Sequence, residues 1–471
     1  MSKPQEAFAL IIFGATGNLA QLKLIPALYD LVEANLLPKQ MTIIGVGRKK
    51  MTDQEFRDYS HRVLHQPNRH HQHPIVEATA AELLGKMRYL AGDIAKPEIY
   101  QQLHGLLDQD RACTNRMFYL ATYPELYQTV FEHLQSSDLN SQKCGFARVI
   151  IEKPIGNDLA SAKQLNQLLA KYYVEDQIFR LDHYLGRETL QNILSFRFAN
   201  NLLEPLINHE QIDHVQVTAA EDFGIGLRGG YYDSVGALKD VGQNHLLQMI
   251  ALATMEEPRD FSNQAITASR LKLLQELRPD PDKLVFGQYD GYLREQDVRP
   301  DSKSDTFFAL RTTIANSRFQ DVPIYVRAGK LLKRTVTEVT FVFKTKGQNP
   351  PNMLVYRVQP NAGIVMRFSS KIPGPTFKLQ NEYLQFCYKN SENGLPDPYL
   401  RLLVDALSGD QTFFVDAEEV EAQWQFVDPL VAKRRQIHSY QPGSWGPEAA
   451  DQLIEADGRK WIEPSVSFCA L

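Results

Sequence analysis

Cysteine is scarce in this sequence. Only four of the 471 residues are cysteines, and Cys113, Cys144, Cys387 and Cys469 lie singly, without the CxxC spacing that zinc sites and dithiol redox motifs use. We therefore expect no zinc or redox role for these four residues. Thiols scattered in this way suit a reduced, cytoplasmic setting.

Long hydrophobic runs and an excess of one charge are also lacking. No apolar stretch reaches the roughly 20 residues that a membrane-spanning helix needs. The N-terminus also lacks the basic, apolar and cleavage regions of a signal peptide in their required order. The 51 lysines and arginines nearly balance 56 aspartates and glutamates, for a net charge of −5. We therefore expect a soluble protein that binds neither nucleic acid nor membranes.

Hydrophobic residues make up 43% of the chain, which at this length is enough for two domains. The continuous apolar run 8–13 is typical of a parallel strand covered by helices on both faces. Apolar residues at helical spacing follow from Leu19. Between them, Gly14 and Gly17 predict a strand-to-helix turn whose backbone approaches a pyrophosphate. Glycines also serve merely to turn the chain, and the pattern alone leaves that alternative open.

A second apolar strand, residues 41–46, is followed by Gly47, Arg48, Lys49 and Lys50. NAD-selective sites usually place an acidic residue near this strand end, where it binds the ribose hydroxyls. Here the side chains are cationic, and the planar guanidinium of Arg48 suits a 2′-phosphate. The pattern favours NADP over NAD, although NAD remains a weaker alternative. The other interpretation is a solvated basic turn.

Strands and helices alternate through the rest of the first third. Strands are predicted at 87–90, 116–121 and 147–151, and helices at 97–107 and 125–135. This alternation predicts a doubly wound parallel sheet. Ligands of such sheets lie beyond the carboxyl ends of the strands, so the nicotinamide contacts that we expect are Tyr123-Pro124 and Glu152-Lys153-Pro154.

One stretch of this region is rich in histidine, with His65, His70, His71 and His73 close together. It lacks cysteine and an ordered ligand spacing. We therefore expect a polar surface loop between helices, and no metal site.

The middle of the chain holds two polar clusters, each followed by an apolar helical pattern. In the first, Asp182, His183, Tyr184 and Arg187 bring an acid, two neutral hydrogen-bonding groups and a guanidinium within six positions, and this exposed-looking set suits a sugar phosphate. The alternative is a satisfied hydrogen-bond cluster between domains.

The second cluster ends at His245. A histidine with a pKa near 6.5 can accept the proton released when an alcohol becomes a carbonyl. A carboxylate must then hold its ring, and the candidates are Asp182 and Asp240. Considered alone, His245 is also compatible with a structural role.

Several motifs in order resemble those of the glucose-6-phosphate dehydrogenase family. They are GATGNLA from Gly14, EKPIG from Glu152, RLDHYLGRE from Arg180, RGGYYD from Arg228, DVGQNH from Asp240 and RAGK from Arg327, with further matches in FYLA, IDHVQVTAAE and WGP. The resemblance implies oxidation of β-glucose 6-phosphate at C1 to 6-phosphogluconolactone with reduction of NADP, the first oxidative step of the pentose phosphate pathway. It covers nearly the whole chain.

The resemblance also implies residue roles. His245 would be the general base and Asp182 would orient it. Positions that match the family's substrate site are Lys153, His183, Tyr184, Arg187, Glu221, Asp240, Lys330 and Gln359. Positions that match its cofactor site are Gly14, Thr16, Gly17, Asn18, Leu19, Lys23, Arg48, Tyr123, Glu152, Lys153 and Pro154.

Family architecture implies a Rossmann domain at residues 1–176 and a larger α+β domain at 177–471. The second domain would hold a mostly antiparallel sheet through which the chain forms homodimers or homotetramers. Strand-like runs at 213–219, 307–313, 338–343 and 364–368 agree with this expectation.

Some positions depart from the family pattern. Arg187 stands where lysine is usual, which keeps the charge and changes its shape. Other departures are Asn18, Gln21, Leu22, Tyr123, Lys239 and Gly242. Two alternatives therefore stay open: a dehydrogenase of another hexose or amino-sugar 6-phosphate, and a noncatalytic NADP-binding relative.

Overall fold

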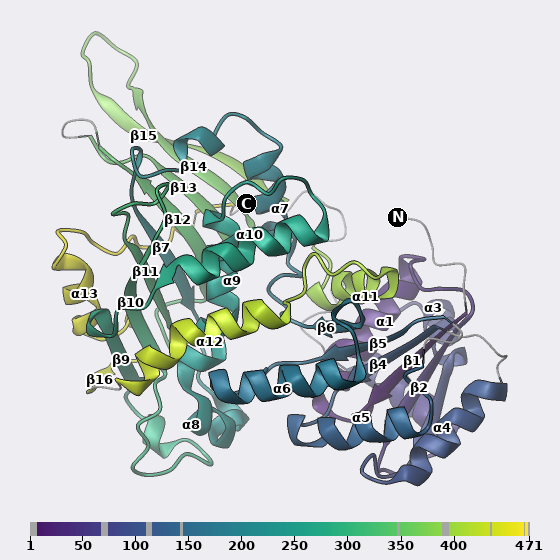
Figure 1. Ribbon diagram of the computed structural model, residues 1–471. Coiled ribbons are helices and arrows are strands. Elements are labelled where there is room, and N and C mark those ends of the chain that lie inside the picture. The colour runs from purple at the N-terminus through teal and green to yellow at the C-terminus, as the bar shows by residue number, and fades with distance from the viewer. Residues whose placement is uncertain are drawn as a thin grey trace. The chain divides into compact units, whose positions relative to one another are not determined.

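The computed structural model describes residues 7–66, 74–109, 115–141, 145–345, 349–388, 395–433, 436–465 and 467–469 (Figure 1). The chain divides into two compact units. Unit 1 comprises Met1–Gly156, Ala160–Gly186 and Pro396–Ala417, and unit 2 comprises Asn157–Leu159, Arg187–Leu395 and Glu418–Leu471. No helix in the described ranges is both long enough and apolar enough to cross a membrane.

A six-stranded parallel sheet forms the centre of unit 1. Its order is β3-β2-β1-β4-β5-β6, so the expected doubly wound parallel sheet is confirmed. The strand order reverses between β1 and β4, which is where such sheets bind dinucleotides. The strands are β1 (Phe8–Phe13), β2 (Met41–Gly47), β3 (Met87–Ala91), β4 (Asn115–Leu120), β5 (Ala147–Ile151) and β6 (Ile178–Arg180).

Helices cover this sheet and complete its apolar core. Side chains of β1, β4 and β5 pack with those of α4, α5 and α6 in one buried cluster, which explains the continuous apolar runs of the strands. The helical elements of this part of the chain are η1 (Ala20–Leu24, a π-helix), α1 (Ile25–Glu33), α2 (Asp53–Leu64), α3 (Glu77–Gly85), α4 (Pro97–Gln109), η2 (Pro124–Leu126), α5 (Tyr127–Ser136), α6 (Leu159–Tyr172) and η3 (Glu175–Gln177).

A late segment of the chain returns to unit 1, and the sequence did not predict it. This segment carries α11 (Pro398–Ser408), and Arg148 of β5 donates to its carbonyl oxygens at Ala406 and Leu407, at 2.8 and 2.9 Å. The expected boundary at residues 176/177 also differs from the structural units, because unit 1 continues to Gly186.

Unit 2 is built on a larger mixed sheet of order β15-β14-β13-β12-β7-β11-β10-β9-β16, with β8 paired to β10. Most neighbours are antiparallel, and β7–β11 and β9–β16 are parallel. The expected mostly antiparallel sheet is confirmed. The strands are β7 (Ile212–Ala220), β8 (Leu277–Arg278), β9 (Leu284–Tyr289), β10 (Phe307–Ile314), β11 (Ile324–Gly329), β12 (Val336–Phe343), β13 (Met353–Gln359), β14 (Gly363–Lys371), β15 (Leu379–Cys387) and β16 (Ile437–Tyr440).

The helices of this second part pack mainly around the long strands. They are α7 (Glu188–Phe198), η4 (Glu204–Leu206), η5 (Gly226–Arg228), α8 (Gly229–Ala237), η6 (Leu238–Leu246, a π-helix), α9 (Leu247–Thr254), α10 (Asn263–Glu276), η7 (Pro281–Lys283), η8 (Tyr292–Arg294), α12 (Ala417–Ala432) and α13 (Glu448–Glu455).

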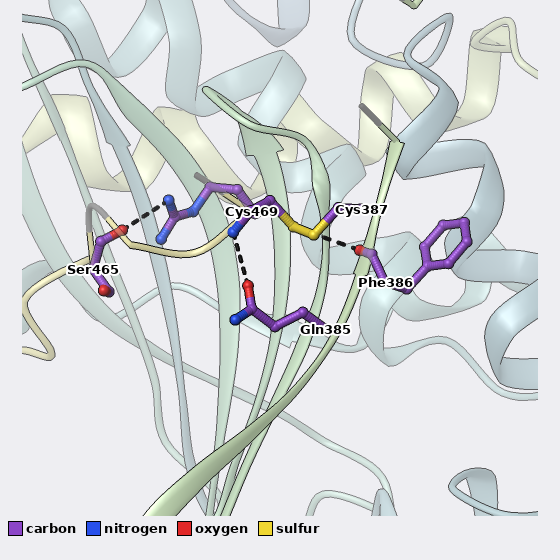
Figure 2. The surroundings of a disulfide bond; sticks show 6 residues. Gln385, Phe386, Cys387, Ser465 and Cys469 are labelled. Carbon is purple, nitrogen blue, oxygen red and sulfur yellow. Dashed lines mark hydrogen bonds between the residues drawn. A yellow bond between two sulfur atoms is a disulfide. The ribbon is translucent and has the colours of Figure 1, made fainter. Parts of the chain in front are cut away.

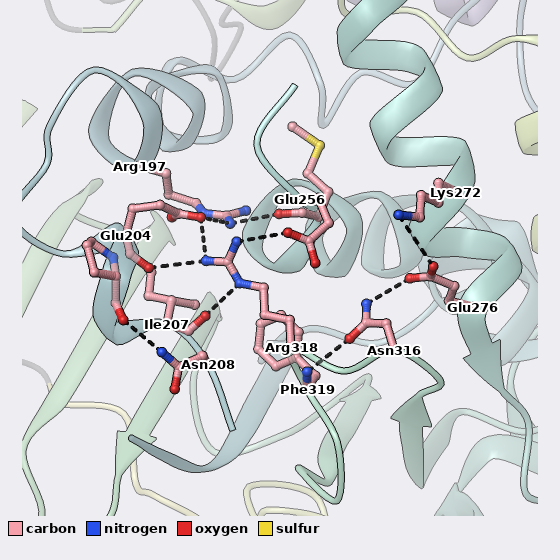
Figure 3. Close-up of polar contacts among 12 residues, drawn as sticks. Arg197, Glu204, Ile207, Asn208, Glu256, Lys272, Glu276, Asn316, Arg318 and Phe319 are labelled. Atoms are coloured by element: carbon pink, nitrogen blue, oxygen red, sulfur yellow. Dashed lines mark hydrogen bonds and ion pairs between the residues drawn. The ribbon is translucent and has the colours of Figure 1, made fainter. Parts of the chain in front are cut away.

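Arginine–carboxylate contacts hold the helices of unit 2 together (Figure 3). Arg197 of α7 donates to both carboxylate oxygens of Glu204, at 3.0 and 2.8 Å, and to the carbonyl oxygens of Leu252 and Met255 near the end of α9. Arg318 also pairs with Glu204 and donates to the carbonyl oxygen of Ile207 at 2.7 Å. Because Arg197 is fully buried, its charge requires these partners.

The expectation that all the cysteines stay reduced is wrong for one pair. Cys387 and Cys469 form a disulfide that spans 82 positions of sequence (Figure 2). The backbone N–H of Cys469 donates to the side-chain oxygen Oε1 of Gln385 at 2.8 Å. The ring of Phe468 contacts the ring of Tyr383. The bond thus joins the C-terminal segment to β15. Spacing in sequence could not predict this pairing, because only the fold brings the two residues together.

Candidate active site

The turn after β1 has the geometry of a dinucleotide loop. Gly14 has φ +88°, and a β-carbon there would overlap the carbonyl oxygen of Ala121. Only glycine fits both conditions. The N–H of Gly17 donates to the carbonyl of Gly14 at 2.9 Å, and Gln21 and Tyr59 both donate to the carbonyl of Thr16. Gly17 and Asn18 are exposed and Leu19 is partly buried. The turn is therefore fixed while its outer backbone stays accessible.

Arg48 lies beside this turn. It directly follows β2, whose Val46 pairs with Phe13 of β1 and accepts backbone hydrogen bonds from Gly14 and Ala15 at 2.9 and 3.2 Å. The Arg48 side chain is exposed. The β2 end thus offers an exposed guanidinium next to the glycine turn.

The structure places Lys23 in a second contact of unit 1. Its Nζ is 3.5 Å from Oδ2 of Asp397 and 5.6 Å from the ring centroid of Tyr399. Asp397 also caps α11 by accepting the backbone N–H of Tyr399 at 2.8 Å. Lys23 therefore links η1 to the returning segment, and its expected place in the cofactor site stays a prediction.

Residues after β4 and β5 stand at the same edge of the sheet as the glycine turn, because all these strands are parallel. Tyr123 is highly exposed and precedes η2. Glu152 and Lys153 directly follow β5, and the Lys153–Pro154 peptide bond is cis. The candidate nicotinamide contacts are thus brought to one edge.

Glu152 lies among tyrosines. Tyr119 of β4 donates to its Oε1 at 2.5 Å, and Tyr399 of α11 is a second hydrogen-bonding neighbour. Burial raises the pKa of Glu152 to about 7, and the hydrogen bonds from Tyr119 and Tyr399 oppose that rise. The carboxyl group therefore changes its charge near neutral pH.

The signature segment after β6 is more buried than its composition indicated. Asp182 is 3% exposed and Tyr184 is also buried, so the expectation of an exposed cluster is wrong for these two residues. Asp182 Oδ1 accepts the backbone N–H of Tyr184 at 2.9 Å. The ring of His183 stacks on Tyr399 with centroids 6.3 Å apart. Because Asp182 and Glu152 follow neighbouring parallel strands, both belong to the same edge of unit 1.

The signature divides between the units after Gly186. Arg187 belongs to unit 2 as the N-cap residue of α7. The structure therefore brings Asp182, His183 and Tyr184 together within unit 1, and the joint action of Arg187 with them stays a prediction.

In unit 2, three candidate substrate residues stand at one edge of the sheet. Glu221 follows β7 and Lys330 follows β11, and these parallel neighbours pair Ala220 with Gly329. The side chains of Glu221 and Lys330 form an ion pair, and Lys330 is 5% exposed. Gln359 ends β13 at the same level, because Thr337 of β12 pairs with Ala219 on one side and Gln359 on the other.

Asp240 is a buried carboxylate of η6 with defined partners. Its Oδ1 accepts the hydroxyl of Tyr231 at 3.3 Å, and its Oδ2 is 3.6 Å from a nitrogen of Arg228. Burial and the charges of Asp240, Asp305 and Glu221 raise the pKa of Tyr232 well above its usual range. Tyr232 lies under the ammonium group of Lys330, 5.6 Å from its ring centroid. These residues therefore form a polar group beside the sheet edge.

His245 sits in the last turn of the same π-helix and is 2% exposed. The unusual Gly242 has a physical reason, since a β-carbon there would lie 2.8 Å from the ring of Phe308 and 2.9 Å from Leu238. Phe308 of β10 thus fills the space that a side chain at position 242 would need. Close packing of η6 on the sheet fixes the backbone that carries Asp240 and His245.

Sequence reasoning missed the tyrosines that surround the carboxylates. Tyr119 lies inside the FYLA match, which does not show what its hydroxyl contacts, and Tyr399 is more than two hundred positions from Glu152. Tyr231 and Tyr232 lie inside the quoted RGGYYD motif, where sequence alone does not show which carboxylate they contact.

Both halves of the chain match models of one family. Residues 11–192 match the model described as glucose-6-phosphate dehydrogenase, NAD binding domain, and residues 194–462 match the model of the C-terminal domain. The first of these supports a nicotinamide dinucleotide as the cofactor.

Similar proteins cover nearly the full length. The glucose-6-phosphate 1-dehydrogenase of Aggregatibacter actinomycetemcomitans is 39% identical, over 98% of this chain and 98% of its own. That of Treponema pallidum is 39% identical, over 97% and 95%. A solved structure described as glucose-6-phosphate dehydrogenase in complex with its substrate glucose-6-phosphate has a TM-score of 0.90 at 35% identity, over 98% of this chain and 100% of its own. The chain therefore belongs to the glucose-6-phosphate dehydrogenase family.

Proposed function

We propose that the protein oxidises D-glucose 6-phosphate at C1 to 6-phospho-D-glucono-1,5-lactone with reduction of NADP. The observation that carries the proposal is the edge of unit 1, where Glu152, Lys153, Asp182 and His183 follow strands parallel to the one that ends in the glycine turn. Residues that match the family's substrate site and residues that match its cofactor site therefore lie at the same edge of the sheet, which is where doubly wound sheets bind their ligands.

His245 acts as the general base in this proposal and takes the proton of the C1 hydroxyl. A neutral imidazole is the form that accepts this proton, and the burial of His245 in η6 restricts its orientation. Asp182 holds the ring and stabilises the imidazolium that forms. A carboxylate that is itself oriented by a backbone N–H, as Asp182 is, suits this role.

Cationic and hydrogen-bonding residues bind the sugar phosphate. His183, Tyr184 and Arg187 contact the phosphate, and the hydroxyls meet Lys153, Glu221, Asp240, Lys330 and Gln359. The Lys330–Glu221 pair supports this assignment, because it presents a donor and an acceptor together at the sheet edge. Arg187 offers a planar fork where the family usually has a point charge.

The glycine turn fits a dinucleotide, since any side chain at Gly14 would collide with Ala121. Gly17, Asn18 and Leu19 provide the first backbone N–H groups of a helix, which suit a pyrophosphate. When bound, the nicotinamide accepts the hydride from C1. Arg48 supports NADP over NAD because a guanidinium pairs with a 2′-phosphate.

We also propose that the chain forms homodimers or homotetramers through β14 and β15. The pairs Ile364–Phe386 and Met366–Leu384 are in register and therefore share one face. Leu384 and Phe386 are 60% and 52% exposed. An apolar sheet face of this kind is typical of an interface. Light scattering should show an oligomer, and Leu384→Glu with Phe386→Glu should dissociate it; an unchanged mass would contradict this interface.

A cytoplasmic setting is part of the proposal, because phosphorylated sugars and NADP are highly charged and remain in the compartment that makes them. A persistent disulfide is uncommon in such a compartment. Cell fractionation should recover the protein in the cytoplasmic fraction. Recovery in another compartment would contradict the setting.

Steady-state rates with a panel of sugar phosphates and both cofactors test the reaction. The highest kcat/KM is expected for glucose 6-phosphate with NADP. A better hexose or amino-sugar 6-phosphate would replace the substrate assignment, and binding of NADP without turnover of any sugar would make the chain a noncatalytic relative.

A further inference from the structure

Two histidines and a glutamate that are not part of the proposed active site converge on the surface of unit 1. His61 lies in the last turn of α2, His65 caps its end, and Glu77 begins α3. Nε2 of His61 is 3.1 Å from Oε2 of Glu77, and Nε2 of His65 is 2.9 Å from Oε1. One ligand atom from each residue lies within 4.8 Å of the other two. Three potential metal ligands are therefore close enough to one another to bind a single ion.

The helix sets the spacing of the two imidazoles. Residues four positions apart share one face of an α-helix, and the ring centroids of His61 and His65 are 4.3 Å apart. A tetrahedral ion with ligands at about 2.0–2.2 Å holds its donor atoms roughly 3.4 Å from one another. The observed separations from Glu77 need only a small outward adjustment of exposed side chains.

A hydrogen bond already orients one of the rings. Nδ1 of His65 is 2.9 Å from the carbonyl oxygen of His61. A carbonyl only accepts, so Nδ1 carries a hydrogen in this contact, and Nε2, which faces Glu77, is the nitrogen that gives up its hydrogen when it binds a metal. Histidines that bind metals usually donate their other ring N–H to a carbonyl or carboxylate in this way. The contact is thus the expected support of a metal ligand.

We propose that His61, His65 and Glu77 bind a divalent first-row transition ion such as Zn²⁺. Imidazole nitrogens with one carboxylate suit Zn²⁺, Ni²⁺ and Cu²⁺, whereas Mg²⁺ and Ca²⁺ prefer oxygen ligands. The three side chains are 42%, 39% and 68% exposed, which leaves room for water to complete the coordination. A bound ion ties the end of α2 to the start of α3.

This proposal departs from the expectation that the histidine-rich stretch holds no metal site. That expectation weighed His65 together with His70, His71 and His73, and the latter three lie outside the described residues. The fold instead joins His65 to His61, one turn earlier, and to Glu77, twelve positions later. Neither partner belongs to the histidine-rich stretch.

Calorimetric titration of the full-length, tag-free protein with ZnCl₂ tests the site, after treatment with a chelator. His61→Asn and His65→Asn should each weaken Zn²⁺ binding about tenfold or more, and Glu77→Gln should weaken it less. The triple variant His70→Asn, His71→Asn and His73→Asn is the matched control and should keep the wild-type affinity. MgCl₂ should produce no binding.

Hydrogen exchange gives a second measurement. Zn²⁺ should slow exchange in peptides that cover 53–64 and 77–85 of the wild type, and should leave both unchanged in the His61→Asn, His65→Asn double variant. Wild-type turnover in that variant would show that it folds. Equal Zn²⁺ affinity in the wild type and double variant would overturn the proposal, as would a loss that the triple control shares in full.

Discussion

The two units stabilise their sheets differently. Unit 1 surrounds a parallel sheet with an apolar core, and its candidate functional groups stand where the strands end. Unit 2 also buries charged side chains between its helices and strands. Among the residues that the structure describes, the arginines Arg180, Arg197, Arg270 and Arg327 are fully buried, and the last three belong to unit 2. Arg270 and Glu419 join α10 to α12 with both side chains inaccessible to solvent.

This difference shows which features of the fold can be predicted from local patterns in the sequence. A rule about strand ends needs only local periodicity, so it applies to unit 1. A buried ion pair such as Arg270–Glu419 joins residues more than a hundred positions apart, and each member resembles a surface residue in sequence. Removing one member of such a pair therefore lowers the free energy of unfolding strongly, and the sequence alone does not predict this loss.

The largest effect is expected from Arg270→Met. Nε and one terminal nitrogen of Arg270 lie 2.9 and 3.0 Å from the two oxygens of Glu419. The substitution leaves a buried carboxylate without that cation and should lower the free energy of unfolding by about 3–5 kcal/mol. Denaturant unfolding monitored by circular dichroism measures the change.

Two further variants sharpen this result. The double variant Arg270→Met, Glu419→Leu removes both charges and should recover most of the stability. Lys272→Met on the same helix removes an exposed pair with Glu276 at 3.9 Å and should cost about 0.5 kcal/mol or less. A loss at Arg270 no larger than that at Lys272 would show that the buried charge of unit 2 contributes no more than an ion pair nearer the surface.

Glu152 gives the corresponding test in unit 1. Because burial raises its folded pKa from 4.5 to about 7, ionisation destabilises the folded state. This cost is absent below about pH 4.5, grows as the pH rises, and is complete above about 7. Glu152→Gln should therefore raise the free energy of unfolding by about 2–3 kcal/mol at pH 8, and hardly at all near pH 4.5.

Tyr119→Phe is the matching change. It removes a hydrogen bond that lowers the pKa of Glu152, so the pKa should rise further. The apparent ionisation in the stability profile should then move to higher pH. A profile of Glu152→Gln that parallels the wild type at every pH would show that Glu152 is not the group that titrates.

A smaller effect is expected at Arg48, where the strand-end rule predicts the cofactor. Arg48→Ala removes a charge-assisted contact with the 2′-phosphate and should raise the KM for NADP about tenfold, with little change for NAD. Lys50→Ala, two positions on in the same exposed turn, is the control. Equal changes in the KM for NADP and for NAD would show that Arg48 does not contact the 2′-phosphate and belongs to a solvated basic turn.

Strand positions and the parallel sheet could be predicted from sequence, because continuous apolar runs occur where both faces of a strand are buried. The predicted strand at 213–219, for example, corresponds to β7 at Ile212–Ala220. The glycine turn was also predictable, since φ +88° and contact with Ala121 require glycine at position 14.

The rest depended on contacts distant in sequence. Tyr399 reaches Glu152 only because residues 396–417 return to unit 1. The close packing of Gly242 against Phe308, three positions before His245, also follows from no periodicity in the sequence. The Cys387–Cys469 bond has the same origin, because β15 and the C-terminal segment meet only in the fold.

The most direct test of the proposed mechanism is the steady-state rate of NADPH formation from glucose 6-phosphate by the wild type and by His245→Asn. Loss of a general base should lower kcat by about 10²–10⁴-fold, with a similar KM for the sugar phosphate. The control variant His438→Asn, at a partly buried position of β16, should keep the wild-type rate. An unchanged kcat in His245→Asn would contradict the account.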